Sequence, residues 1–345
     1  MSTTPLPGTL RASAEPLCHA YDVAMLDLDG VVYVGGDAVP GASDHLASAR
    51  REGIRLAFIT NNAARAPHDV ARHLSDLGIP AGAADVVTSA QAAAGLAAER
   101  FGRDARIGCV GGPGLAWALE DAGLVVVGPD ESPDAVVTGY GPEVPWHRIM
   151  RAATIVKAGV PWIASNTDAT IPTSYGVAPG HGALVDLIAA FAGVRPEVAG
   201  KPARPLLDET VHRMAANRPL MVGDRLDTDI VGGRNAGVDS LLVLTGVTGL
   251  EELVAARSDE RPAYLARDLE GLVATHPEVR PSGGLWTTGG WTGSTEAGRL
   301  RVDGNGSGDD WWRVAAAASW AHLDRTGDVV DVAGLGIPEV AAIPR

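Results

Sequence analysis

Short apolar runs alternate with amphipathic stretches along most of the chain. The first run, Val23 to Leu26, is continuously apolar and spans only those few positions, which is typical of a strand buried on both faces of a parallel sheet. Runs of this kind and longer helical patterns follow one another up to about residue 275. This alternation predicts an α/β fold in which helices connect parallel strands through right-handed crossovers.

The apolar pattern also sets the expected bounds of the elements. The expected strands are the short apolar runs 23–26, 55–60, 105–110, 124–127, 135–137, 162–165, 219–222 and 240–244. The expected helices, which carry one apolar face, are 43–52, 66–77, 90–101, 113–122, 147–158, 182–192, 204–217 and 229–236. A last strand and a short helix are expected between residues 264 and 274.

The middle of the chain is too long to be a connection within one sheet, because it holds several expected strands and helices of its own. We therefore expect a Rossmann-like parallel-sheet core formed by residues 18–85 and 199–278. Residues 86–198 are expected to form a second α/β domain inserted into that core. Residues 1–17, which are polar and contain prolines, are expected to be a loose arm.

The composition changes in the last part of the chain. Residues 279–345 begin with a segment rich in Gly, Thr and Ser. Short strands are expected near 300–302, and a helix is expected over 311–323, with Asp309 or Asp310 as its N-cap. This part is predicted to be a small α+β extension.

Composition and charge narrow the classes of function. Of the 345 residues, 46% are hydrophobic and 20% are charged, as in globular proteins. The net charge of −14 argues against a nucleic-acid partner, since neutralising phosphates requires a basic face. Only Cys18 and Cys109 are present, which favours a reducing compartment. No signal-peptide pattern and no apolar run of about 18 residues occurs, so a cytoplasmic protein without a membrane span is expected.

Polar residues follow three of the apolar runs directly. Asp27-Leu28-Asp29 follows the first run, the second run ends in Thr60-Asn61-Asn62, and Gly223-Asp224 follows the run that starts at residue 219. Lys201, one of only two lysines, stands at a helix start before that third run. Each string alone also occurs in ordinary turns and helix caps. Because parallel strands direct their carboxyl ends to one edge of a sheet, together they predict a single reactive site.

These residues carry a resemblance to a known family. The order Asp27-x-Asp29-Gly30-Val31, Thr60-Asn61-Asn62, Gly200-Lys201-Pro202 and Val222-Gly223-Asp224 resembles the haloacid dehalogenase (HAD) superfamily of phosphatases. The insertion between the second and third motifs resembles the α/β cap of its NagD-like class. The resemblance covers about residues 20–275 and implies a HAD core with an inserted cap.

The resemblance implies a role for each motif residue. Asp27 would be the nucleophile that forms an aspartyl-phosphate, and Asp29 would protonate the leaving alcohol and then activate water. Mg²⁺ would be bound by the carboxylates of Asp27 and Asp224 and by the main-chain carbonyl of Asp29. Asp229 would orient the waters on the metal. Lys201 would hold Asp27 and the phosphate.

The remaining motif residues are assigned in the same way. Thr60 and Asn61 would donate hydrogen bonds to phosphoryl oxygens, and Asn62 belongs to the same phosphate-binding stretch. Asp227 occupies a variable position of the family and is expected to be a surface acid. The dehalogenases of the superfamily lack an acid at the position of Asp29, so carbon–halogen cleavage is not expected.

The inserted domain is expected to select the leaving alcohol. Asn166, Asp168, Ile171 and His181 are the candidate contacts. Ile171 stands roughly where relatives that act on pyridoxal phosphate carry a histidine, which disfavours that substrate. For His181, which is expected in a loop, a substrate contact and a structural or capping role both remain open.

The core, the cap and the extension together resemble bacterial glycerol-3-phosphate phosphatases, whose extension is a truncated acetyltransferase-like fold. The expected reaction is therefore the magnesium-dependent hydrolysis of a small-molecule phosphate ester, with glycerol 3-phosphate as first candidate and phosphoglycolate as second. A non-catalytic regulator that binds a phosphometabolite is the alternative from another class, although such a protein has no need of the acid at Asp29. A homodimer is kept as a candidate assembly, because caps of this class often take part in dimerisation.

Overall fold

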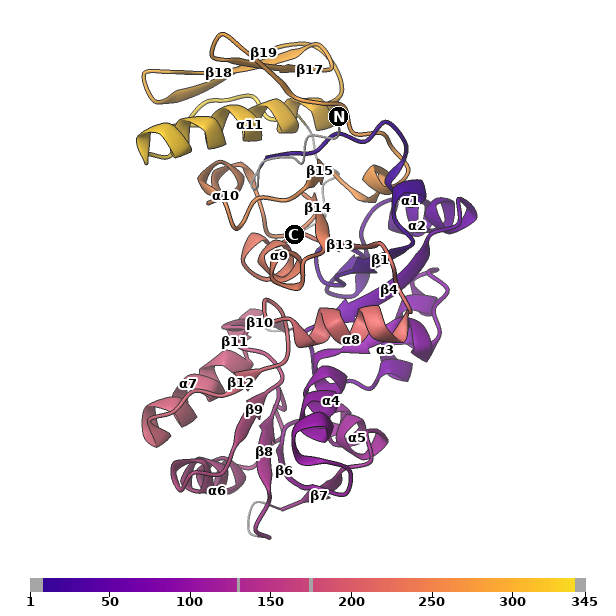
Figure 1. Cartoon of the computed structure of the whole chain (residues 1–345), viewed down its shortest axis with the longest axis vertical. Helices are drawn as coiled ribbons and strands as arrows, with labels where there is room; N and C mark the ends of the chain where they lie inside the picture. Colours follow the sequence, from indigo (N-terminus) through magenta and orange to yellow (C-terminus); the bar gives the residue numbers. More distant parts are fainter. Residues whose placement is uncertain (1–8, 129–130, 174–175, 339–345) are drawn as a thin grey trace. The chain divides into compact units, whose positions relative to one another are not determined.

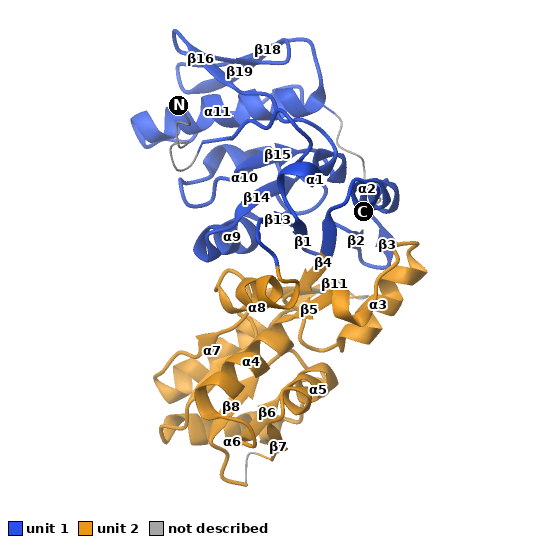
Figure 2. Ribbon diagram, turned by 45° about the vertical axis from the view of Figure 1, so that its right-hand side comes forward, with its two compact units in different colours: residues 1–56, 216–345 blue, residues 57–215 orange. Residues whose placement is uncertain are grey.

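The computed structural model describes residues 9–128, 131–173 and 176–338. The chain divides into two compact units, residues 1–56 with 216–345 and residues 57–215, which Figure 2 shows in different colours. Residues 1–8 of the expected arm lie outside the described residues. The predicted boundaries of core, cap and extension do not coincide with this division and remain predictions.

The first unit is built on a parallel sheet with the strand order β15-β14-β13-β1. The strands are β1 (Val23–Leu26), β13 (Pro219–Gly223), β14 (Asp239–Val243) and β15 (Tyr264–Ala266). All residues of β1 are buried, as its continuous apolar run predicts. The predicted parallel α/β architecture is therefore confirmed.

Helices and a small hairpin surround this sheet in the first unit. They are α1 (Leu17–Ala20), β2 (Tyr33–Val34), β3 (Asp37–Ala38), α2 (Ala42–Arg51), η2 (Leu226–Ile230), α9 (Val231–Ala236), α10 (Leu250–Ala255) and η3 (Leu269–Leu272). The helix predicted over 229–236 begins at Val231, because η2 before it is a wider π-helical turn.

Residues 9–17 are bound to the rest of the first unit, and the expectation of a loose arm is wrong for this segment. The main-chain N–H of Arg11 donates to the carbonyl of Ala263 at 2.8 Å, and Ser13 pairs with His276 through hydrogen bonds of 2.7 and 2.9 Å. Leu17 is fully buried. Apolar anchorage and main-chain pairing thus hold a segment whose polar composition suggested an unattached chain.

The extension forms an antiparallel sheet covered by one long helix, at the top of Figure 1. Its elements are β16 (Arg280–Ser282), β17 (Leu285–Thr288), β18 (Trp291–Glu296), β19 (Arg299–Gly304) and α11 (Gly308–Thr326). Two-residue turns with positive φ at both positions, Gly283-Gly284, Gly289-Gly290 and Ala297-Gly298, join the strands, as type I′ hairpins require. The expected α+β class is confirmed, and the likeness to an acetyltransferase remains a prediction.

Helix α11 begins three residues before its predicted start. Its N-cap is Ser307, whose hydroxyl accepts a hydrogen bond from the N–H of Asp310 at 3.2 Å. The prediction of Asp309 or Asp310 as the cap is therefore wrong, because the upstream Ser307 offers an equally good acceptor. Gly327 ends the helix in the left-handed conformation, as glycine commonly does.

A buried polar network ties α11 to the rest of the first unit. Arg313, which is 4% exposed, donates to Asp310 Oδ1 at 2.7 Å and to His276 Nδ1 at 2.9 Å. The other ring nitrogen of His276 lies 2.8 Å from the carbonyl of Gly271. Burial, with the positive charge of Arg313 as second cause, lowers the pKa of His276 to about 4. The imidazole is therefore neutral, and it accepts from the guanidinium.

The second unit holds a five-stranded parallel sheet with the order β12-β9-β8-β6-β7. Its strands are β6 (Arg106–Val110), β7 (Val125–Val127), β8 (Ala135–Thr138), β9 (Trp162–Ala164) and β12 (Glu197–Val198). An antiparallel hairpin of β10 (Thr170–Thr173) and β11 (Gly176–Pro179) follows β9. Strand β4 (Arg55–Thr60), which enters this unit at residue 57, pairs in parallel with β5 (Val86–Thr88).

The helices of the second unit lie close to their predicted bounds. They are α3 (Pro67–Asp76), η1 (Ala83–Asp85), α4 (Ser89–Phe101), α5 (Pro113–Asp121), α6 (Trp146–Lys157), α7 (His181–Ala192) and α8 (Pro205–Arg213). Helix α8 ends four residues before the predicted end at residue 217. Helices α6 and α7 pack on each other.

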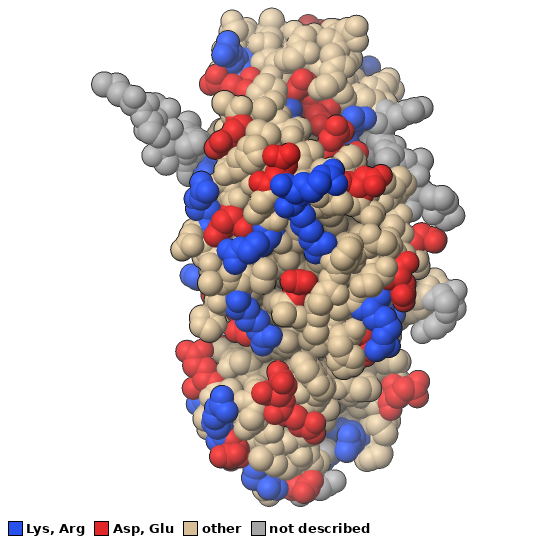
Figure 3. Space-filling model, turned by 90° about the vertical axis from the view of Figure 1, so that its right-hand side faces the viewer, with Lys and Arg blue, Asp and Glu red and all other residues tan. Residues whose placement is uncertain are grey.

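No helix within the part of the chain that the structure describes is long and apolar enough to cross a membrane. Acidic and basic side chains are interspersed over the face shown in Figure 3. That face is therefore mixed in sign, unlike the basic face that a nucleic-acid backbone requires.

Replacing Arg313 with methionine is expected to lower the free energy of unfolding by about 3–5 kcal/mol, because it leaves the buried Asp310 carboxylate without its cation. The measurement is urea unfolding followed by tryptophan fluorescence. The exposed Arg280, which pairs with Glu278 on the surface, is the control, and Arg280→Met should change stability by less than about 0.5 kcal/mol. Equal effects of the two substitutions would contradict a structural role for the buried network.

Candidate active site

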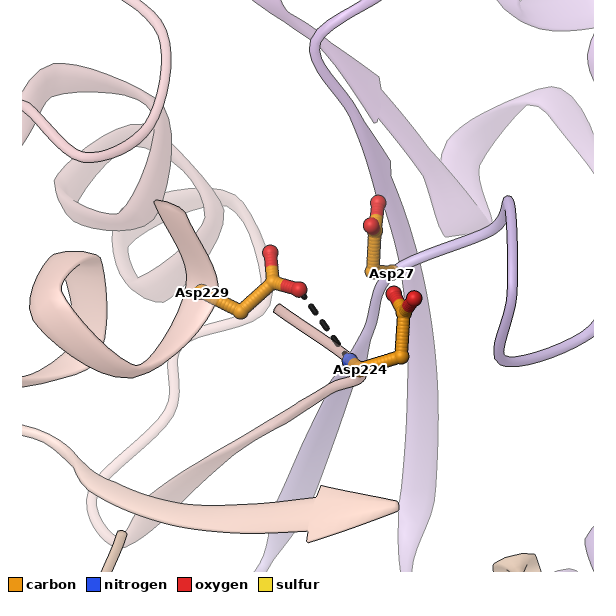
Figure 4. Close-up of side chains that lie close together, drawn as sticks. All are labelled: Asp27, Asp224 and Asp229. Carbon is orange, nitrogen blue, oxygen red and sulfur yellow. Dashed lines mark hydrogen bonds between the residues drawn. The ribbon is translucent and has the colours of Figure 1, made fainter. Parts of the chain in front are cut away.

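Three carboxylates of the first unit converge at the ends of two neighbouring strands (Figure 4). Asp27 follows β1, Asp224 follows β13, and Asp229 lies in the π-helical turn η2. Ligand oxygens of the three residues lie within 4.8 Å of one another. The strands pair in parallel with Leu26 opposite Val222, so their carboxyl ends lie side by side and bring the acids together.

Glycines leave the space that the buried carboxylates occupy. A Cβ on Gly30 would lie 2.4 Å from Asp224 Oδ2, and one on Gly246 would lie 2.0 Å from the same oxygen. A Cβ on Gly223 would lie 2.2 Å from the Cβ of Asp229. Gly30 also has a φ of +84°, which favours glycine. A larger residue at any of these positions would displace the cluster.

Main-chain N–H groups hold two of the carboxylates. Asp229 Oδ2 accepts from the N–H groups of Asp224 at 3.2 Å and Arg225 at 3.1 Å. Asp224 Oδ2 accepts from the N–H of Val247 at 2.7 Å. Asp224 and Asp229 are both 0% exposed. These fixed donors set the orientation of the acids and offset part of their negative charge.

The cluster is suited to a hard divalent cation. Carboxylates this close repel one another in a low-dielectric site, and a cation between them removes that cost. Oxygen-only donors are the ligands that Mg²⁺ and Ca²⁺ prefer. The structure thus brings together two predicted metal ligands, Asp27 and Asp224. It also places Asp229 within reach of the same ion, although the sequence predicts only an orienting role for it.

The other acids near the cluster differ in exposure. Asp29 is exposed and lies in the tight loop after β1, where the N–H of Gly30 donates to the carbonyl of Tyr33 at 2.8 Å. Asp227 is exposed too, and Arg225 donates two hydrogen bonds to it, at 3.1 and 2.8 Å. Partial burial opposes its ionisation, but Arg225 outweighs this and lowers the pKa of Asp227. The structure thus places Asp227 at the surface, as predicted.

In the second unit, the structure brings Asn61, Lys201 and Asp168 together. The amide Nδ2 of Asn61 donates to the carbonyl of Lys201 and to Asp168 Oδ1, both at 3.0 Å. Its Oδ1 accepts from the N–H of Lys201 at 2.9 Å. Both N–H bonds of this amide are therefore engaged. The predicted hydrogen bond from Asn61 to a phosphoryl oxygen would accordingly come from the main-chain N–H.

The residues beside Asn61 complete the turn after β4. Thr60 is 4% exposed, and its Oγ1 accepts from the N–H of Asn62 at 3.1 Å. Asn62 Oδ1 in turn accepts from the N–H of Ala64 at 2.8 Å. The hydroxyl hydrogen of Thr60 can therefore still be donated. Its predicted role as a hydrogen-bond donor to a phosphoryl oxygen is thus chemically sound.

The predicted cap residues have different surroundings. Asn166 is 3% exposed and donates to the main-chain carbonyl of Asn61 at 2.6 Å. Ile171 lies half-buried on β10. His181 is 3% exposed at the first position of α7, with Nδ1 2.8 Å from the carbonyl of Asn166. The structure thus gives His181 a structural contact, and a substrate contact for it remains a prediction.

His181 is neutral in the folded chain. Its Nδ1 faces a carbonyl and therefore carries the proton, and its Nε2 is buried with no hydrogen-bond partner in the structure as described. Burial lowers the pKa of His181 to about 4, against the weaker opposing effect of the bond to Asn166. Protonation would place an uncompensated charge in the interior of the second unit.

Some participants are not evident from the sequence. The side chain of Asn61 forms hydrogen bonds with the main chain of Lys201, 140 positions away. No local sequence pattern predicts such bonds. Gly246 and Val247 contact Asp224. The segment Thr245-Gly246-Val247 directly follows a predicted strand. This position after a strand is the one sequence signal that places the segment near the acid cluster.

Comparison with known proteins identifies the family to which this fold and acid cluster belong, a family of hydrolases. Two models match: "Haloacid dehalogenase-like hydrolase" over residues 24–125 and "HAD-hyrolase-like" over residues 198–272. The chain belongs to the haloacid dehalogenase-like hydrolase family, as its motifs predict.

Named relatives narrow the class. The chain is 39% identical over 301 residues to the D-glycerol 3-phosphate phosphatase of Mycobacterium tuberculosis, an alignment that covers 85% of this chain and 82% of the relative. It is 36% identical over 256 residues to the acid sugar phosphatase of Staphylococcus haemolyticus, covering 74% and 96%. These names confirm the predicted enzyme class, a phosphatase.

Solved structures agree with this assignment. The glycerol phosphate phosphatase of Mycobacterium tuberculosis in complex with magnesium matches with a TM-score of 0.81 and 39% identity, covering 89% of this chain and 92% of that one. The same protein in complex with calcium covers 94% of both chains, with a TM-score of 0.81 and 37% identity. The 4-nitrophenylphosphatase of Thermotoga maritima matches with a TM-score of 0.69 and 32% identity, covering 74% and 98%.

The pKa of His181 predicts a pH dependence of stability. The folded form stays neutral down to about pH 4, whereas an unfolded histidine protonates near pH 6.5. The unfolded chain therefore binds more protons between these values, so the free energy of unfolding is greatest above pH 6.5 and falls as the pH drops towards 4. The loss from this one group is about 3 kcal/mol.

The variant His181→Asn keeps a donor for the Asn166 carbonyl but does not titrate, so it should lose about 3 kcal/mol less than the wild type between pH 7 and pH 4. Urea unfolding at each pH measures the difference. The same substitution at the exposed His147 is the control and should leave the pH profile unchanged. An unaltered profile for His181→Asn would refute the neutral, buried state.

Proposed function

We propose that this phosphatase hydrolyses glycerol 3-phosphate in a magnesium-dependent reaction through an aspartyl-phosphate. The convergence of Asp27, Asp224 and Asp229 at the strand ends supports the chemistry. The Mycobacterium tuberculosis relative, which covers most of this chain, supports the substrate.

In the proposed reaction a carboxylate oxygen of Asp27 attacks phosphorus, and the bond from phosphorus to the glycerol oxygen breaks. Asp29 gives its proton to that oxygen as glycerol leaves. Water then attacks phosphorus and gives a proton back to Asp29. The bond between phosphorus and the Asp27 oxygen breaks, inorganic phosphate leaves, and both aspartates return to their starting states. The exposure of Asp29 suits a group that exchanges protons with an entering alcohol or water.

Charge neutralisation is assigned to Lys201 and to the turn after β4. Lys201 would offset the negative charge of the phosphoryl oxygens, since an ammonium acts as a compact point charge. The hydroxyl of Thr60 and the main-chain N–H of Asn61 would donate to the same oxygens. Lys201 is 1% exposed, so its charge is only weakly screened by solvent.

The proposed metal is Mg²⁺, held by Asp27 and Asp224, with the carbonyl of Asp29 as a further ligand. Asp229 either orients waters or adds a ligand. When bound, the ion removes the repulsion between the attacking carboxylate and the phosphate dianion. The oxygen-only donor set and the glycine-lined space around Asp224 fit such an ion.

Two other kinds of phosphate ester are alternative substrates, and the activity assay below compares them with glycerol 3-phosphate. The acid sugar phosphatase relative favours sugar phosphates as a second candidate, and phosphoglycolate stays as a third. A non-catalytic regulator is not carried further, because the named relatives are phosphatases.

We also keep a homodimer and a cytoplasmic location within the proposal. Large apolar side chains are exposed on α6 and α7: Trp146, Met150, Leu187 and Phe191. Such a surface supports self-association.

The cysteines support the proposed cytoplasmic location. The free, buried Cys18 and Cys109 suit a reducing compartment.

The proposed function is tested by phosphate release from glycerol 3-phosphate, phosphoglycolate, sugar phosphates and 4-nitrophenyl phosphate, with Mg²⁺ and with excess EDTA. We expect the highest kcat/KM for glycerol 3-phosphate and a loss of more than about 100-fold in EDTA. Asp224→Asn should raise the Mg²⁺ concentration needed for half-maximal rate by about tenfold or more. A higher kcat/KM for another ester would reassign the substrate, and full activity in EDTA would exclude the metal.

A further inference from the structure

The side chain of Asn61 pairs with the main chain of Lys201 as one peptide group pairs with another. Its Oδ1 accepts from the Lys201 N–H at 2.9 Å, and its Nδ2 donates to the Lys201 carbonyl at 3.0 Å. A main-chain N–H can only donate and a carbonyl can only accept, so these partners fix the orientation of the amide. The two bonds define both the position and the direction of the backbone from which the buried Lys201 side chain extends.

A third hydrogen bond fixes Asn61 itself. Its second Nδ2 hydrogen points to Asp168 Oδ1 at 3.0 Å, and hydrogen bonds to an ionised acceptor are stronger than neutral ones. Asn166 supports the same point, since it donates to the carbonyl of Asn61 at 2.6 Å and accepts from the N–H of Asp168 at 3.1 Å. The loop that contains Asn166 and Asp168 therefore fixes Asn61, and the side-chain amide of Asn61 in turn fixes the main chain of Lys201.

The packing around this junction admits little movement. A Cβ on Gly200 would lie 2.6 Å from Asn61 Oδ1 and 2.5 Å from the carbonyl of Ser165, so glycine is needed before Lys201. The loop is held from its other side by α7. There the ring of His181 contacts the Asn166 carbonyl at 2.8 Å, and the N–H of Gly182 donates to the Asp168 carbonyl at 2.8 Å.

We propose that Asn61 is a positioning residue that sets the place of the Lys201 ammonium, and that Asp168 acts by holding Asn61. The inference rests on the phosphate-binding role proposed above for Lys201. It assigns Asp168 to the chemistry common to all substrates, although the sequence places it among the candidates for recognising the alcohol.

The isosteric variant Asn61→Asp tests this directly. The substitution replaces the Nδ2 donor with a carboxylate oxygen. This oxygen faces the acceptor carbonyl of Lys201, and its negative charge lies next to the carboxylate of Asp168. We expect kcat to fall by about 30- to 100-fold, because small displacements of a catalytic group have effects of this size. The fall should be equal for glycerol 3-phosphate and 4-nitrophenyl phosphate, and KM should change less than about threefold. Asn217→Asp, an exposed change of the same kind, should leave kcat unaltered.

The double variant Asn61→Asp, Asp168→Asn restores a donor and an acceptor between the two side chains and removes the added charge. It should recover about tenfold of the lost kcat. In a Lys201→Met background, Asn61→Asp should cause no further loss beyond about threefold, because the group that it positions is absent. If Asn61 had only a structural role, Asn61→Asp would lower kcat by the same factor in the Lys201→Met background as in the wild type.

Three results would overturn the inference: wild-type kcat in Asn61→Asp, a loss confined to glycerol 3-phosphate, or full additivity with Lys201→Met. Near wild-type activity in Lys201→Met alone would instead refute the proposed role of Lys201, so the two failures are distinguishable. Should Asn61→Asp lack a native circular dichroism spectrum, Asp168→Ala decides, with an expected fall in kcat of about tenfold for both substrates. An unchanged rate in Asp168→Ala would then overturn the inference.

Discussion

Like charges crowded at the ends of β1 and β13 are the constraint that shapes the first unit. Asp27, Asp224 and Asp229 present ligand oxygens within 4.8 Å of one another, and two of the three residues are fully buried. Such an arrangement costs folding free energy unless hydrogen bonds and a cation offset it. Main-chain donors supply part of that compensation, and glycines leave room for the acids at the points of closest approach. A bound cation would supply the rest.

The second unit solves a different problem, that of holding one buried cation at a defined place. Lysine has a flexible stem, so fixing its ammonium requires that the backbone beneath it be fixed first. Asn61 does this through two hydrogen bonds to the main chain of Lys201. The loop of Asn166 and Asp168, packed on the N-terminus of α7, holds Asn61. A segment predicted to recognise substrate thus also has a structural task.

Much of the fold and part of the site could be predicted from the sequence, because both depend on local patterns. The continuous apolar run of β1 marks a buried parallel strand, and acids that directly follow such strands must gather at one edge of the sheet. Asp27 and Asp224 meet for that reason. The helices of the second unit begin and end near their predicted residues because their apolar faces and terminal glycines are local signals.

What could not be predicted depends on contacts between distant residues or on turn chemistry. In the extension the sequence predicts short strands only near residues 300–302, yet Gly283-Gly284 and Gly289-Gly290 are two-residue turns of a larger hairpin sheet. The polar residues 9–17 looked unattached because their partners, Ala263 and His276, lie some 250 positions away. The bonds of Asn61 to Lys201 likewise join segments 140 positions apart, and a single sequence carries no record of such pairs.

In the proposed reaction, Asp27 is the residue that becomes phosphorylated. Borohydride reduces an aspartyl-phosphate to homoserine, so the enzyme can be quenched with borohydride during turnover of glycerol 3-phosphate with Mg²⁺ and then digested for peptide mass spectrometry. We expect homoserine at position 27, none at positions 29, 224 or 229, and none at all without substrate. Rapid turnover with an unmodified Asp27, or homoserine at another of these positions, would contradict the role of Asp27 as nucleophile.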